Sequence, residues 1–88
     1  MTTATTRQWQ IDMIFEEDVD HTTATATVIT PAGQHLRAAG QARRNPHDRP
    51  VARIGEEVAG ARALSNLAHE LLEYAAREIE TNVRGERG

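Results

Sequence analysis

The C-terminal part of the chain carries apolar residues at the spacing of one long amphipathic helix, over residues 52–84. At about 100° per residue, two apolar rows lie next to each other and together span an arc of about 160–200°. A helix that covers a single core needs a stripe of only about 100°. The first row contains Ile54, Val58, Ala61, Ala68, Leu72, Ala75, Ile79 and Val83, and the second contains Gly60, Leu64, Leu67, Leu71 and Tyr74.

This helix is expected to overhang the rest of the fold. A helix of some 30 residues is about 45 Å long, whereas strands of some 8 residues reach about 27 Å. A second copy of the chain, related by a two-fold axis, would bury the surplus apolar surface. The alternative is a bent or broken helix that wraps its own sheet. For a homodimer, the sequence places the interface at Gly60, Leu64, Leu67, Leu71 and Tyr74.

Before the helix, the apolar spacing changes from 3.6 residues to two, which indicates strands. The clearest alternation covers residues 7–15, where Trp9, Ile11, Met13 and Phe15 share one face. The acidic run that follows, residues 16–20, predicts a turn.

Two further strands are expected at about 22–30 and 34–43. The first alternates threonine with small apolar residues, which suits a half-exposed strand. Pro31 and Gly33 predict a tight turn between the two. Residues 43–50 are polar and contain two prolines, so they predict a link. The expected fold is α+β: one domain over 1–88, a three-stranded antiparallel meander packed on one long C-terminal helix.

Composition supports self-association. The chain has 88 residues, of which only Trp9, Phe15 and Tyr74 are aromatic. A domain of this size buries only about 60% of its unfolded surface, so a monomeric core would be thin. The chain has no cysteine, and therefore no disulfide or thiolate metal site. Its polar first six residues do not resemble a secretory signal, and no stretch approaches a membrane span, so we expect a cytoplasmic protein.

Charge is unevenly distributed although the net charge is only −3. All ten basic residues are arginine, and a cluster of them could bind phosphate or nucleic acid. The other interpretation is a solvated loop whose arginines pair with the acidic run. Two negative charges, Glu56 and Glu57, lie where a helix start would otherwise favour phosphate, which makes nucleic-acid binding the weaker alternative. The cluster contains Arg37, Arg43, Arg44, Arg49 and Arg53.

The sequence shows no pattern typical of catalysis, a cofactor or a metal site. No pair of histidines has the spacing of metal ligands on one helical turn. Ser65 lies within the helix rather than on a strained turn, and no phosphate-binding glycine loop is present. We therefore expect a non-enzymatic module without cofactors that binds itself and a protein partner. The four histidines are His21, His35, His47 and His69.

Three segments carry a resemblance to a known family: residues 42–48, which begin Ala42-Arg43-Arg44-Asn45, the helix start Ile54-Gly55-Glu56-Glu57, and residues 61–68, which begin Ala61-Arg62-Ala63-Leu64. With them, the chain resembles a family of small actinobacterial proteins of unknown function over residues 9–80. The resemblance implies a fold that has been compared with the double-stranded-RNA-binding domain, and it implies no established activity.

Overall fold

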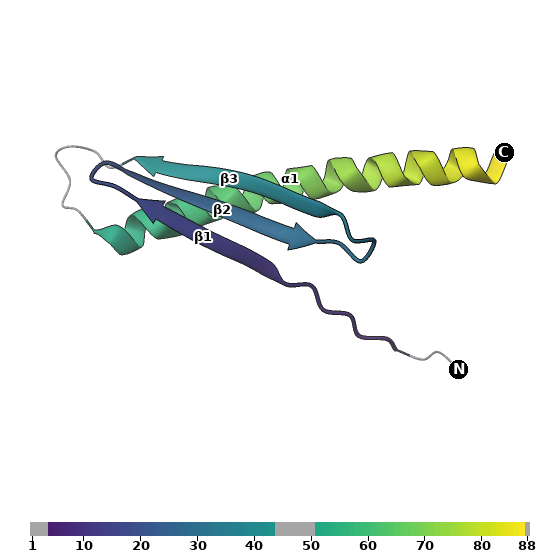
Figure 1. Cartoon of the computed structure of the whole chain (residues 1–88), viewed down its shortest axis with the longest axis horizontal. Helices are drawn as coiled ribbons and strands as arrows, with labels where there is room; N and C mark the ends of the chain where they lie inside the picture. The colour runs from purple at the N-terminus through teal and green to yellow at the C-terminus, as the bar shows by residue number, and fades with distance from the viewer. Residues whose placement is uncertain (1–3, 44–50, 88) are drawn as a thin grey trace.

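Three antiparallel strands form one sheet, and a long helix packs on one of its faces (Figure 1). The computed structural model describes residues 4–43 and 51–87. The strands β1 (Ile11–Glu17), β2 (His21–Ile29) and β3 (His35–Arg43) are adjacent in chain order, and α1 (Ala52–Arg87) follows. The predicted fold class is therefore confirmed. Most of the expected link before the helix, residues 44–50, lies outside the described residues.

The first strand is shifted from its predicted range of 7–15. Ile11 pairs with Val28 and Glu17 pairs with Thr22, so the ladder continues through the first two acidic residues. The turn is shorter than expected because the carboxylate of Asp18 closes it. Hydrogen-bonding partners in β2, rather than the local apolar alternation, set the limits of β1.

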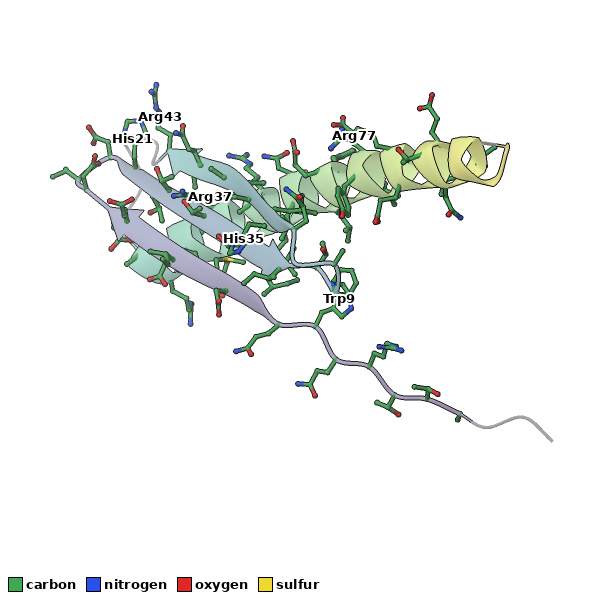
Figure 2. The ribbon with its side chains drawn as sticks, turned by 45° about the vertical axis from the view of Figure 1, so that its right-hand side comes forward. Trp9, His21, His35, Arg37, Arg43 and Arg77 are labelled. Carbon is green, nitrogen blue, oxygen red and sulfur yellow. The ribbon has the colours of Figure 1, made fainter. Side chains whose placement is uncertain are left out.

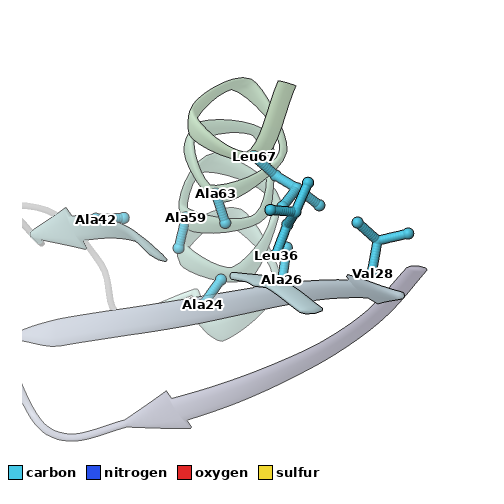
Figure 3. Packing of buried hydrophobic residues seen from close by; sticks show 8 residues of the cluster. All are labelled: Ala24, Ala26, Val28, Leu36, Ala42, Ala59, Ala63 and Leu67. Atoms are coloured by element: carbon cyan, nitrogen blue, oxygen red, sulfur yellow. The ribbon is translucent and has the colours of Figure 1, made fainter. Parts of the chain in front are cut away.

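Small side chains fill the space between the sheet and the helix (Figure 3). The described core has no aromatic residue, and it contains no large side chain that is completely buried. The row of α1 that faces the sheet begins with Ala59 and Ala63 and continues to Leu67. The core consists of Ala24, Ala26, Val28, Leu36, Ala42, Ala59, Ala63 and Leu67.

Gly40 of β3 explains why this row faces the sheet. A Cβ atom at Gly40 would lie 2.6 Å from the carbonyl oxygen of Ala59 and 2.7 Å from the carbonyl carbon of Arg62. The backbone of the helix therefore rests directly on the strand. Such a close approach requires alanine on the helix, and the row that begins with Ile54 and Val58 is too bulky for it.

The molecule is much less compact than its length allows. Its radius of gyration is 17.9 Å, within extents of 60 × 32 × 18 Å. A compact domain of this length has a radius of gyration of about 12 Å. The chain exposes 7339 Å², whereas a compact monomer of the same mass exposes about 5,100 Å². The C-terminal half of α1 extends past the sheet, as the helix length predicted (Figure 1).

Candidate interaction surface

The first apolar row of α1, called the outer row below, points away from the sheet. Its large members are exposed: Leu72 by 68% and Ile79 by 65%. No side chain within residues 4–43 and 51–83 covers them. The outer row consists of Ile54, Val58, Ala61, Ala68, Leu72, Ala75, Ile79 and Val83.

The outer row has the spacing of a coiled coil. From Ile54 to Ile79 its members are alternately four and three residues apart, with Ser65 at the one position that is not apolar. Apolar residues at this heptad spacing form the contact line of two helices that pack side by side. Alanine fills every second position between Ala61 and Ala75, which allows two helix backbones to approach closely. The sequence contains this heptad spacing, but the wide apolar arc does not indicate which of its two rows forms the contact.

The five residues predicted for the dimer interface are placed differently. Leu67 is only 3% exposed and belongs to the core of its own chain, so the sheet, not a second copy, covers it. Gly60 lies under β1, where an added Cβ would be 3.3 Å from Sδ of Met13. Leu71 and Tyr74 are half-buried against the core, and Leu64 remains 43% exposed. The homodimer itself stays a prediction.

The free edge of β3 is blocked by side chains of the helix. Nδ2 of Asn66 donates to the carbonyl of Ala39 at 2.7 Å, and Nη1 of Arg62 donates to the carbonyl of Gln41 at 2.7 Å. Exposed edges of this kind are templates for unwanted pairing unless they are covered. One face of α1 therefore protects one edge of the sheet.

The turn between β1 and β2 holds a small polar cluster. Oδ1 of Asp18 accepts hydrogen bonds from the backbone N–H groups of Asp20, at 2.9 Å, and His21, at 2.8 Å. Nε of Arg43 donates to Nε2 of His21 at 3.1 Å. Because Nε2 must accept this bond, His21 carries its proton on Nδ1, which lies 3.8 Å from Oδ1 of Asp18. The cluster fastens the turn to the end of β3.

These backbone hydrogen bonds, first from Asp20 and then from His21, lower the pKa of Asp18. Because the pKa of Asp18 is lower in the folded chain, this carboxylate stabilises the fold at pH values above its pKa in the unfolded chain, about 3.9. The stabilisation is lost as the pH falls through its pKa in the folded chain. We expect Asp18→Asn to keep the turn, because the amide oxygen still accepts the backbone hydrogen bonds of Asp20 and His21. Between pH 5 and pH 2, this variant should lose less of its free energy of unfolding than the parent. Urea unfolding at both pH values measures this. Equal losses in the two chains would contradict it.

The predicted arginine cluster is spread over both layers of the molecule. Arg37 and Arg43 lie on β3, on the face of the sheet that the helix does not cover (Figure 2). Arg37 shares a cross-strand row with Thr27 and Asp12, so an acidic residue lies close by. Arg53 lies in the first turn of α1. The other two members, Arg44 and Arg49, fall outside the described residues.

The described residues contain no group of three side chains that could hold a metal ion. His35 is exposed, and Nδ1 of His69 lies 3.0 Å from the carbonyl of Ser65. A hollow of about 750 Å³, lined by Trp9, Asp12 and His35 among others, lies beside the N-terminal segment. Within the part of the chain that the structure describes, no helix is long and apolar enough to cross a membrane.

Comparison with known proteins identifies the family. Residues 7–87 match the Rv2632c-like family. The chain belongs to this family. The uncharacterized protein Rv2632c of Mycobacterium tuberculosis is 44% identical over 73 residues, which are 83% of this chain and 77% of the relative. The uncharacterized protein Mb1767 of Mycobacterium bovis is 36% identical over 74 residues, 84% of this chain and 78% of the relative.

A solved structure of the Rv2632c-like family has the same fold. The crystal structure of Rv2632c matches with a TM-score of 0.82 and 40% sequence identity, over 92% of this chain and 95% of that chain. The expected membership of a family of uncharacterised proteins is confirmed at this level. The names of these relatives state no activity, so function has to be argued from the surface of the chain.

Proposed function

We propose that this Rv2632c-like chain is a non-enzymatic interaction module that self-associates through the outer row of α1. The observation that carries the proposal is the exposed heptad of this row on the side of the helix opposite the sheet. Two copies that packed these rows together would form a helix pair with a sheet on each outer side. Leu64 and Leu71, at the flank of the row, would lie beside the contact.

The exposed area is large enough for this assembly. The chain exposes 7339 Å², which is about 2,200 Å² more than the roughly 5,100 Å² of a compact monomer of its mass. A standard interface buries about 800 Å² on each partner, which is less than half of this surplus. The outer row is about 40 Å long between Ile54 and Ile79, at about 1.5 Å per residue, so it can supply the whole contact.

We expect the double substitution Leu72→Glu and Ile79→Glu to lower the mass of the assembly, because it places charges in the centre of the helix contact. Both side chains are exposed in the single chain, so the fold should remain. Sedimentation equilibrium gives the mass, and circular dichroism checks the fold. Thr81→Glu adds a charge to an exposed polar position of the same helix and serves as the control.

Two results would contradict the proposed contact. One is a parent chain that stays monomeric at high concentration. The other is a double variant that keeps the parent mass while Thr81→Glu behaves identically.

The proposal includes a protein partner. An amphipathic helix of another protein would fit the outer row in the same way as a second copy, by presenting its own apolar residues at heptad spacing. The chain has no cysteine, so it has no disulfide that would require an oxidising compartment, and we place this activity in the cytoplasm.

The alternative function is nucleic-acid binding through the arginine cluster. Arg37 and Arg43 share one face of the sheet, and the suggested likeness to the double-stranded-RNA-binding domain would fit such a role. Short double-stranded RNA, added in the same sedimentation experiment, would then raise the mass at low salt and lose its effect at high salt. Arg43→Ala would weaken that binding. A mass that RNA leaves unchanged would favour the protein interaction.

A further inference from the structure

We propose that the free edge of β1 is a second self-association surface, at which β1 pairs antiparallel with β1 of another copy. This contact goes beyond the proposed function because the backbone of the sheet makes it, whereas the outer row of the helix makes the other. A chain with two separate two-fold contacts builds assemblies of more than two copies.

The hydrogen bond at the first turn shows which residues face the free edge. The N–H of Asp18 donates to the carbonyl of His21 at 2.9 Å, so these two residues form a hydrogen-bonded pair. Such pairs alternate along an antiparallel ladder. Even-numbered residues of β1 therefore bond to β2. The N–H and C=O groups of Ile11, Met13 and Phe15 point outward, and no described residue outside β1 bonds to them.

The two edges of the sheet differ in whether their outward backbone groups have hydrogen-bonding partners. At β3, the outward carbonyls of Ala39 and Gln41 accept hydrogen bonds from Asn66 and Arg62. At β1, no corresponding side chain reaches the outward groups within the described part of the chain. An open row of backbone donors and acceptors is matched by another extended strand.

Apolar side chains also gather at the open edge. The helix packs mainly on β2 and β3 (Figure 3), and it approaches β1 near Gly60, beside Met13 and Phe15. On the face of β1 that looks towards the helix layer, Ile11 remains 49% exposed and Phe15 39% exposed. A second β1 strand at this edge would bring the same residues of both copies together and remove them from water.

The charges of β1 select a register for two copies. With Met13 opposite Met13 of the second copy, Ile11 lies opposite Phe15 of the second copy. Asp12 then faces Ile14 of the second copy, and no two acids are opposed. If the pairing is shifted to centre on Ile14, Asp12 faces Glu16 of the second copy, twice in each dimer. Like charges directly opposite each other destabilise a strand pair, so the centre on Met13 is favoured over the centre on Ile14, and it keeps Ile11 and Phe15, both within β1, opposite each other. The outward N–H of each Met13 then donates to the outward C=O of Met13 in the other copy.

Proline at Met13 tests this contact. The N–H of Met13 does not bond to β2, so Met13→Pro removes an outward donor and leaves the internal ladder complete. Met13→Ala removes the side chain and keeps the donor. We expect the mass of Met13→Ala to equal that of the parent, and the mass of Met13→Pro to fall at least twofold, to that of a dimer held by the helix contact. Equal masses for folded Met13→Pro and Met13→Ala would overturn the pairing.

Cross-linking tests the same contact without relying on the fold of a proline variant. Because the chain has no cysteine, Met13→Cys carries the only thiol. Opposed residues of such a pair have Cα atoms about 5.5 Å apart, within reach of a short bis-maleimide. We expect Met13→Cys to give cross-linked dimers and Gln41→Cys, on the blocked edge of β3, to give none. Equal cross-linking of the two variants, or cross-linking of neither, would overturn the proposal.

Measurements on the Leu72→Glu/Ile79→Glu chain separate this contact from the helix contact. We expect Met13→Cys to cross-link in that background as well. If the double substitution alone produces monomers that no longer cross-link, the edge pairing is wrong and the helix contact stands. If cross-linking persists and the double substitution leaves the mass unchanged, the helix contact is wrong and the edge pairing stands.

Discussion

Gly40→Ala is expected to lower the free energy of unfolding more than any other substitution of a glycine in this chain. The new methyl group would lie within 2.7 Å of the backbone of α1, at the Ala59 carbonyl oxygen and at the Arg62 carbonyl carbon, and it would also meet the backbone nitrogen of Ala63. Backbone atoms cannot turn aside as a flexible side chain does, so the helix has to lift from β3. Overpacking of this kind costs about 3 kcal/mol or more, which is a large part of the stability of a small domain. Urea unfolding followed by circular dichroism measures the loss.

Gly60→Ala is the matched control for this substitution. Its added Cβ would lie 3.3 Å from Sδ of Met13 and 3.4 Å from Cζ of Phe15. These are side-chain atoms at the open edge of the sheet, and small shifts relieve the contact. Alanine is also favoured over glycine in a helix by about 1 kcal/mol. We expect the free energy of unfolding of Gly60→Ala to lie within about 1 kcal/mol of that of the parent. Equal stability of Gly40→Ala and Gly60→Ala would mean that the helix does not rest on β3.

Leu67→Glu should abolish folding. Leu67 is the largest side chain that α1 contributes to a core composed mainly of alanine. Truncation of a buried leucine alone costs about 2–5 kcal/mol, and a buried carboxylate without a partner adds to that cost. Thermal unfolding of Leu67→Glu should show no cooperative transition.

Leu64→Glu, one helical turn away, provides the comparison. Leu64 is partly exposed, so this variant should fold with a cooperative transition close to that of the parent. If Leu67→Glu retained a cooperative transition, the row from Ala59 to Leu67 could not be the one that packs on the sheet. The same pair of variants therefore tests the orientation of α1 about its own axis.

The order of the elements could be predicted because each is long and has a clear period. The end of β1 could not, because Glu16 and Glu17 look like turn residues until their partners Thr23 and Thr22 are known. The Thr22 hydroxyl lies 3.3 Å from Oε1 of Glu17, which gives one of these acids a role within the strand pair. The acidic residues by themselves predict a turn from residue 16. The pairing of Glu16 and Glu17 with β2 instead extends the strand, so the turn begins later in the chain.

The orientation of the helix was beyond the reach of its own sequence. A helix with two apolar rows does not indicate which one meets the sheet. The choice depends on Gly40 and the small residues beside it in β2 and β3, which admit a row of alanines and exclude the row with Ile54 and Leu72. For this reason the helix sequence alone predicts Leu67 in the dimer interface, whereas the structure places it in the core.

The parts of the surface that depend on distant partners were also hidden. Arg62 and Asn66 read as ordinary polar positions of a helix. Arg62 and Gln41 are separated by 21 residues in the sequence, and Asn66 and Ala39 by 27. These hydrogen bonds therefore form only when the helix packs against the sheet. The same holds for the contrast between the two sheet edges, which no single segment of the sequence reveals.

Blocking one edge limits how far this sheet can extend. Amyloid-like growth adds strands without end, because each added chain offers a fresh edge to the next. Here Arg62 and Asn66 close the edge at β3, so a chain that joins a neighbour through β1 offers no further strand. Sheet extension therefore stops at two molecules. We expect concentrated solutions of the folded protein to stay free of fibrils that grow by continuous strand addition.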